Sequence, residues 1–166
     1  MSSFVPRASR TLLFSIVAVA LALVGACHGG NDVTGTGGSL VHINVDAPDT
    51  ATSGQPFNVN LTTQNVGVSS VNNGVVTATL PAPLSVTSVN AASGTSATFS
   101  NSSSGATVTW QVGTLGANSG DSLTVQTVGT LAPGSANMPL AIQAQLTATG
   151  ISPGEDVATD SVTLMP

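Results

Sequence analysis

Residues 53–67, SGQPFNVNLTTQNVG, carry the pattern that decides the fold. Phe57, Val59 and Leu61 occupy alternate positions and Thr63 continues the row, while mostly polar side chains fill the positions between them. A period of two places successive side chains on opposite faces of a β-strand. The stretch therefore predicts a half-buried strand whose apolar row faces a core.

The same alternation recurs along the rest of the chain and predicts a domain made of strands. Turn signals such as Asn73-Gly74 and Pro81-Ala82-Pro83 separate neighbouring runs. Apolar spacings of three and four are not sustained and β-branched residues dominate, so we expect no helix. About nine short strands predict an antiparallel β-sandwich. The other predicted runs are 41–45, 76–80, 84–89, 96–100, 106–115, 122–131, 139–149 and 156–164.

Charge in this chain is scarce and one-sided. Lys and Arg total 2, Asp and Glu total 7, and both basic residues, Arg7 and Arg10, lie close to the N-terminus. Beyond Arg10 the formal side-chain charge is therefore 0 − 7 = −7. Binding to nucleic acid and attraction to anionic lipid both depend on Lys and Arg, so we exclude nucleic acid as a partner and a basic lipid-binding patch. The lack of lysine also excludes Schiff-base chemistry and Lys–Asn isopeptide bonds.

The N-terminus has the organisation of a secretory signal. Arg7 and Arg10 precede an apolar run over residues 12–26, which ends in the small residues Gly25 and Ala26. A helix that spans the bilayer core needs roughly 20 apolar residues, and no basic flank follows this run. We therefore expect a cleaved signal peptide and not a membrane-spanning helix.

The end of this run, Leu23-Val24-Gly25-Ala26-Cys27, resembles the lipobox of bacterial lipoproteins. The resemblance implies cleavage between Ala26 and Cys27, a diacylglycerol on the Cys27 thiol and an acyl chain such as palmitate on the new amino group. An ordinary secretory signal, cut at the same bond without lipid, is the alternative. Cys27 is the single cysteine of the chain, which excludes an intramolecular disulfide and favours the lipoprotein. His28, in place of the Asp that retains such proteins in the inner membrane, implies the outer membrane of a two-membrane host.

These features divide the chain into three predicted segments. Residues 1–26 are a signal peptide, residues 27–39 are the lipidated cysteine with a flexible Gly/Thr/Ser tether, and residues 40–166 are the sandwich. About 140 residues remain after cleavage, a length that suits a single hydrophobic core.

Three blocks of the sandwich, residues 53–67, 75–84 and 112–125, resemble a conserved repeat domain of unknown function found in bacterial and archaeal surface proteins. That domain is an immunoglobulin-like β-sandwich, so the resemblance implies this fold for residues 40–166. It also implies a place in the cell envelope, and it carries over no enzyme chemistry.

The sharpest hint of catalysis is Gly150-Ile151-Ser152-Pro153-Gly154, which matches the G-x-S-x-G elbow of hydrolases. The residue after the serine must supply a backbone N–H to the oxyanion hole, and Pro153 has none. The triad histidine should also follow the serine, yet His28 and His42 both precede it. We interpret the motif as a β-turn and expect no enzymatic activity.

Metal and cofactor sites are not expected either. Neither histidine has a second ligand at short spacing, which favours solvated side chains. Two small acidic groups, Asp46 with Asp49 and Glu155 with Asp156 and Asp160, lack the spacing of a D-x-D-x-D-G calcium loop. The sequence therefore predicts no bound metal and no cofactor.

Function is predicted only as a class. Phe57, Phe99 and Trp110 fall on the same alternate positions as the inward-facing apolar residues of their strands. We therefore expect all three in the core and no aromatic platform for sugars. The leading hypothesis is a lipid-anchored, non-enzymatic envelope protein that binds a protein partner, for adhesion or structural association, through loops or an unpaired sheet edge. The alternative is an accessory module that binds a glycan or another ligand.

Overall fold

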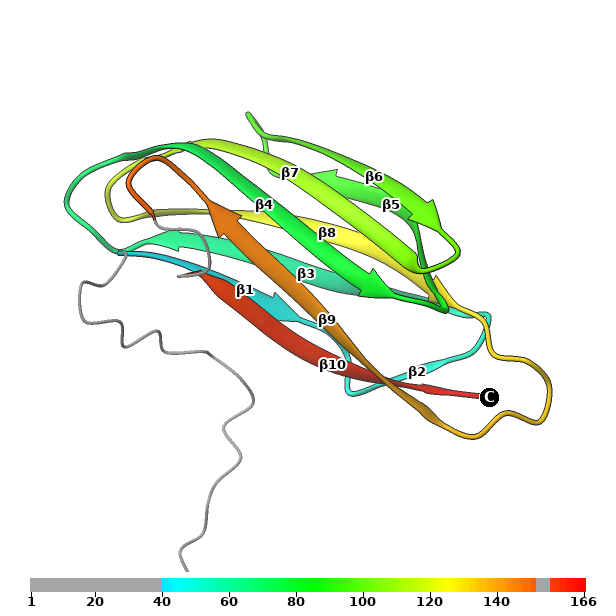
Figure 1. The fold of residues 1–166 in the computed structure, drawn as a ribbon. Helices are drawn as coiled ribbons and strands as arrows, with labels where there is room; N and C mark the ends of the chain where they lie inside the picture. The colour runs from blue at the N-terminus through cyan, green and yellow to red at the C-terminus, as the bar shows by residue number, and fades with distance from the viewer. Residues whose placement is uncertain (1–39, 152–155) are drawn as a thin grey trace, which may run out of the picture.

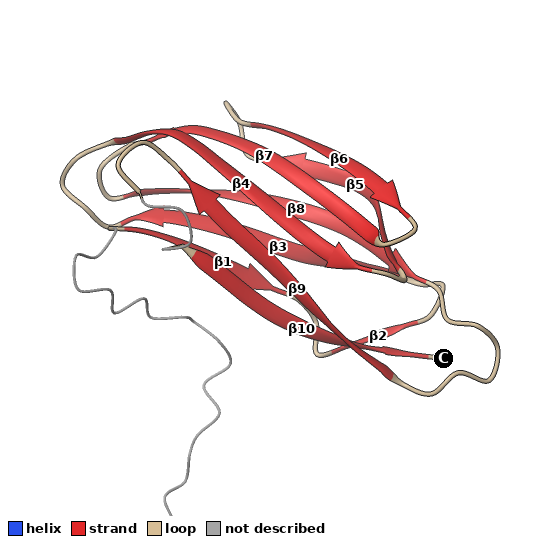
Figure 2. Ribbon diagram, in the orientation of Figure 1, coloured by secondary structure: helices blue, strands red, loops and turns tan. Residues whose placement is uncertain are grey.

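The computed structural model describes residues 40–151 and 156–166, which form strands and no helix (Figures 1 and 2). Within that part of the chain no segment meets the length and hydropathy of a membrane-spanning helix. The strands are β1 (Val41–Asp46), β2 (Thr50–Thr52), β3 (Pro56–Asn65), β4 (Val71–Pro81), β5 (Leu84–Ala91), β6 (Ser96–Ser102), β7 (Gly105–Leu115), β8 (Ser119–Gly129), β9 (Met138–Thr147) and β10 (Val157–Met165).

The strands form two sheets that pack face to face. One is four-stranded in the order β1-β3-β8-β5, and the other is six-stranded in the order β2-β10-β9-β4-β7-β6. Neighbouring strands run antiparallel except β2 and β10, which run parallel. The predicted all-β, immunoglobulin-like sandwich is confirmed.

The core lies between the sheets and is built from the alternating rows that the sequence predicts. In β3, Val59, Leu61 and Thr63 are buried, and Phe57 packs half-buried against the same core. The opposite sheet contributes rows from β4, β7, β9 and β10. The largest fully buried side chains are Trp110, Leu61, Leu80, Leu115, Leu123, Ile142, Leu146 and Leu164.

The three aromatic residues of the domain differ in burial. Trp110 is 0% exposed, as predicted, and its indole N–H donates to the Thr95 hydroxyl at 3.1 Å. The prediction for Phe99 is wrong, because its side chain is 40% exposed. Phe99 has inward parity, since it pairs with Val108, but β6 is the outermost strand of its sheet. Too little of the opposite sheet lies over an edge strand to bury a large side chain fully.

Asn73-Gly74 is not the turn that the sequence predicts but part of β4. Asn73 has a φ of 58°, and the register against β7 shifts on both sides of Gly74, which is the geometry of a β-bulge. Asn and Gly tolerate positive φ in bulges as well as in hairpin turns, so the dipeptide alone does not separate the two.

The described residues contain ten strands where about nine were expected, because β2 lies inside the break predicted between β1 and β3. The chain leaves the four-stranded sheet after β1 and joins the edge of the six-stranded sheet. There the Asp49 carbonyl accepts from the Thr163 N–H at 2.9 Å, and the Ser53 N–H donates to the Met165 carbonyl at 2.7 Å. Three residues are too few to show a period in sequence.

Candidate functional site

The predicted lipidation site lies outside the described residues. Ala26, Cys27 and the tether to residue 39 therefore stay sequence predictions.

The G-x-S-x-G motif is described only in its first half. Gly150 has a φ of 88°, and the Ile151 N–H donates to the Ala148 carbonyl at 3.2 Å, so a turn follows β9. Ser152, Pro153 and Gly154 lie outside the described residues, and the interpretation of the whole motif as a β-turn stays a prediction.

The described acidic residues of the two predicted groups and His42 serve the fold or face the solvent, and Glu155 lies outside the described residues. Asp160 joins the two sheets, because its Oδ2 accepts from the Ala47 N–H at 2.8 Å. His42 pairs with Gln64 on the outer side of the four-stranded sheet, and Asp156 is 1% exposed. Among the described residues, no three His, Cys, Asp or Glu side chains come together in a group that could hold a metal ion.

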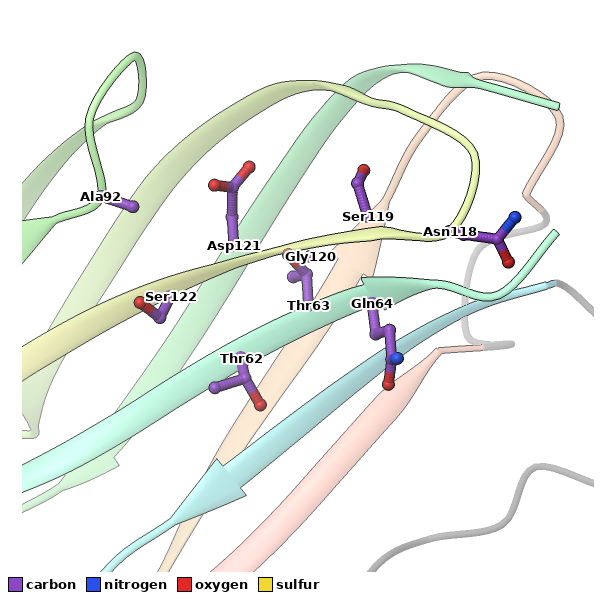
Figure 3. A pocket seen from close by; sticks show the side chains of 9 residues that line it. All are labelled: Thr62, Thr63, Gln64, Ala92, Asn118, Ser119, Gly120, Asp121 and Ser122. Carbon is purple, nitrogen blue, oxygen red and sulfur yellow. The ribbon is translucent and has the colours of Figure 1, made fainter. Parts of the chain in front are cut away.

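A shallow polar depression of ≈ 400 Å³ lies beside β3 and the start of β8. Figure 3 shows Ser119 and Asp121 on one side of this strand pair and Thr62, Gln64 and Ser122 on the other. The lining is hydroxyl, amide and backbone, with one carboxylate; it comprises Thr62, Thr63, Gln64, Ala92, Asn118, Ser119, Gly120, Asp121 and Ser122. It holds no nucleophile paired with a base, so its chemistry suits weak contacts with a neutral polar group.

The more distinctive surface is the open edge formed by β6. This strand pairs with β7 on one side and ends the six-stranded sheet on the other. Its residues SATFSNS include no charge and no proline, and most of them are exposed. Natural sheets protect such edges with lysine, proline or covering segments, because the free N–H and C=O groups can pair with another strand. We call Ser96–Ser102 the β6 edge.

The neighbouring edge strand, β5, is partly closed by the β6 edge itself. The Val86 N–H donates to Asn101 Oδ1 at 2.9 Å, and Asn101 Nδ2 donates to the Val86 carbonyl at 2.9 Å. The amide thereby pairs with β5 as a strand residue would and joins the two sheets on this side. Figure 1 shows β5 and β6 side by side there. Phe99 lies two residues before Asn101 with the same inward parity and exposes two-fifths of its surface there.

The sequence predicts an unpaired edge but not which strand forms it. Edge position follows from the order of strands in each sheet, which depends on contacts between residues far apart in the chain. The one local signal for β6 is its composition, since seven consecutive residues contain a single large apolar side chain.

The fold and this edge define the class: an immunoglobulin-like β-sandwich domain with an open, uncharged sheet edge. No family model matches the chain, and no curated protein matches it.

Solved structures share its fold at low sequence identity. A cohesin module from a Clostridium perfringens family 33 glycoside hydrolase is 12% identical with a TM-score of 0.57, and the match covers 77% of this chain and 98% of the module. A non-cellulosomal cohesin from Archaeoglobus fulgidus is 14% identical with a TM-score of 0.54, covering 76% and 91%. The CARDB domain of a Pyrococcus furiosus protein, solved in complex with di-metal ions, is 16% identical with a TM-score of 0.51, covering 75% and 87%. At these identities the likeness concerns the fold alone.

Proposed function

We propose that this protein is a non-enzymatic module of the cell envelope, held to a membrane by lipid on Cys27, that binds a protein partner through the β6 edge. In a host with two membranes, the anchored protein would lie in the outer membrane. The partner would add a strand to β6, and the association would serve adhesion or envelope structure.

The observation that carries this proposal is the uncharged, unprotected β6 edge. Strand addition derives its affinity from main-chain hydrogen bonds and its specificity from alternate side chains. Phe99 would supply the apolar contact for an incoming side chain, because it is half-exposed beside the free edge. A cohesin of the same fold from Acetivibrio cellulolyticus, 14% identical, was solved in complex with a dockerin, which supports a protein as the partner class.

A photo-crosslinking amino acid at Ser100, in the β6 edge, tests this proposal in intact cells. The matched control places it at Thr79, another exposed hydroxyl on the same sheet but on a strand paired on both sides. We expect one defined crosslinked protein from Ser100 and none from Thr79. With the photo-crosslinking amino acid moved to Thr98, Ser100→Lys should abolish crosslinking to the same protein, whereas Thr79→Lys should leave it unchanged. Equal crosslinking from both positions would contradict partner binding at this edge.

Glycan binding remains a second candidate because of one observation, the exposed aromatic ring of Phe99. A sugar ring could stack on the exposed part of this ring at the edge of the sheet. Glycan-array binding that Phe99→Ala abolishes and Phe99→Trp retains would favour this function over strand addition. Equal glycan binding by the wild-type protein, Phe99→Ala and Phe99→Trp would contradict a glycan site at Phe99.

The lipid anchor has its own test. The wild-type protein should incorporate an alkyne-tagged fatty acid and partition with membranes, whereas Cys27→Ser should do neither. An epitope tag after Pro166, labelled in intact and in permeabilised cells, would then report on which side of the envelope the domain lies.

A further inference from the structure

We propose that the end of the sandwich at which the described chain begins contacts the lipid bilayer directly. The contact is made by three exposed apolar residues, Leu40, Val66 and Val68, which we call the apolar tip. This inference rests on the proposed lipid anchor at Cys27 and adds a second, weaker membrane contact to it.

The apolar tip is a cluster and not a set of scattered side chains. Five large hydrophobic side chains are exposed in the described part of the chain, and three belong to the tip: Leu40 at 55%, Val66 at 43% and Val68 at 88%. The Val66 N–H donates to the Leu40 carbonyl at 2.7 Å. A Cβ on Gly67 would come within 2.9 Å of the Leu40 side chain, so Leu40 lies over the same loop.

The β3–β4 loop, which carries Val68, has several of its backbone polar groups satisfied within the protein. The Gly67 N–H donates to Asn65 Oδ1 at 2.9 Å, and the Gly67 carbonyl accepts from the Asn118 N–H at 3.2 Å. Asn65 Nδ2 also donates to the Ser69 carbonyl at 2.8 Å. Unsatisfied backbone groups are the main cost of placing a loop in lipid. This loop avoids much of that cost while it exposes an apolar side chain.

The tip lies at the end of the domain from which the chain leads back to the proposed anchor. Twelve residues, 28–39, separate Cys27 from Leu40, and a Gly-rich coil of that length has a root-mean-square span of roughly 20 Å. The β3–β4 and β7–β8 connections lie at this end, whereas the C-terminus lies at the other (Figure 1). A lipid on Cys27 would therefore hold the tip near the bilayer at high local concentration, where weak contact suffices.

The apolar tip would contact lipid through apolar burial and not through attraction to negatively charged headgroups. The domain contains no Lys and no Arg, so attraction to acidic headgroups cannot supply the contact. Burial of apolar side chains at the headgroup boundary is the remaining driving force. The contact should consequently form on uncharged phosphatidylcholine vesicles.

Full-length lipidated protein in phosphatidylcholine vesicles provides the test. The diacylglyceryl group would occupy the sulfur of Cys27, the only native thiol, so a polarity-sensitive, thiol-reactive fluorophore labels only an introduced cysteine. Val68→Cys places the probe at the tip, and Ala136→Cys places it in the exposed β8–β9 loop at the other end. We expect a blue shift and quenching by spin-labelled lipid at position 68, and water-like emission without quenching at position 136.

The outcomes separate this inference from the anchor itself. Water-like emission at both positions, on protein that floats with the vesicles, would overturn the tip contact and leave the anchor standing. Labelling of wild-type protein at Cys27 without flotation would overturn the anchor, and this inference with it. In the Val68→Cys background, Val66→Ser should reduce quenching at least twofold. Unchanged quenching would show that the fluorophore alone inserts and would overturn the tip contact.

Discussion

Replacement of Asn65 by alanine should destabilise the sandwich more than the loss of any other single polar side chain. Asn65 is 0% exposed at the end of β3. Its Nδ2 donates to the carbonyls of Ser69 at 2.8 Å, Leu115 at 3.1 Å and Gly116 at 3.0 Å, and its Oδ1 accepts from the Gly67 N–H at 2.9 Å. One amide thereby joins the β3–β4 loop to the β7–β8 turn.

The size of the destabilisation by Asn65→Ala follows from the hydrogen-bond partners of Asn65 that water cannot reach. The bonds to the Leu115 carbonyl and the Gly67 N–H are buried, whereas those to Ser69 and Gly116 are only partly buried. A buried polar group left unsatisfied costs about 1–3 kcal/mol. Two such groups predict that Asn65→Ala lowers the free energy of unfolding by about 2–6 kcal/mol.

Asn65→Asp has the same shape and tests the donor role by itself. Its carboxylate would keep the bond from the Gly67 N–H but place a second oxygen against three carbonyls. This raises the pKa of the introduced carboxyl in the folded state, because only the protonated form can donate. The folded state then binds more protons than the unfolded state, so stability should fall as the pH rises and partly recover in acid.

Urea unfolding followed by Trp110 fluorescence measures these losses, in a Cys27→Ser background that carries no lipid. Asn58→Asp is the control, because it adds the same charge at an exposed position of the same strand and should change stability by less than about 0.5 kcal/mol. The reasoning is refuted if Asn65→Ala costs under about 1 kcal/mol, or if Asn65→Asp is no less stable than Asn58→Asp at neutral pH.

Three further substitutions test the core and the turns. Thr127 is 0% exposed and its hydroxyl has no hydrogen-bond partner among the described residues, so Thr127→Val should stabilise the domain by about 1 kcal/mol in urea unfolding; a loss of stability would contradict this. Trp110 emission should be blue-shifted and resist acrylamide, and Trp110→Ala should cost about 3–5 kcal/mol by circular dichroism; solvent-like emission in the folded protein would oppose its burial. Gly105 has a φ of 126°, and a Cβ there would lie 2.1 Å from the Leu80 carbonyl oxygen, so Gly105→Ala should cost more than about 2 kcal/mol. Gly116→Ala is the control without positive φ and should lower the melting temperature less than Gly105→Ala in thermal unfolding; equal losses would contradict the strain argument.

The strands were predictable because their evidence is local. In β3, the alternate positions of Val59 and Leu61 indicate which side chains face the core before any partner strand is known. Trp110 follows the same rule in β7, with Val108 and Val112 on its face. Burial of one face of a sheet is enough to produce such a pattern, so nine predicted runs correspond to nine of the strands.

The failures occur where a local pattern has two tertiary meanings. Phe99 has inward parity, but parity does not report how much of the opposite sheet covers a strand. Asn73-Gly74 satisfies positive φ equally well in a hairpin turn and in the bulge of β4. Asn65 continues the parity of the inward row in β3, but parity does not report polar contacts, and only the packed loops show that its amide is bonded four times.

The sequence by itself determined most of the strand faces, because periodicity is a property of neighbouring residues. Charge and short motifs are local in the same way, and they carry the expectations that no nucleic acid binds and that Cys27 is lipidated. The tertiary structure alone decided that β6 ends its sheet, that Asn101 closes the β5 edge at Val86, and that Leu40 gathers with Val66 and Val68 at one end. These features depend on the order in which distant strands pair. The free energy that selects that order comes from the shared core, which no single segment contains.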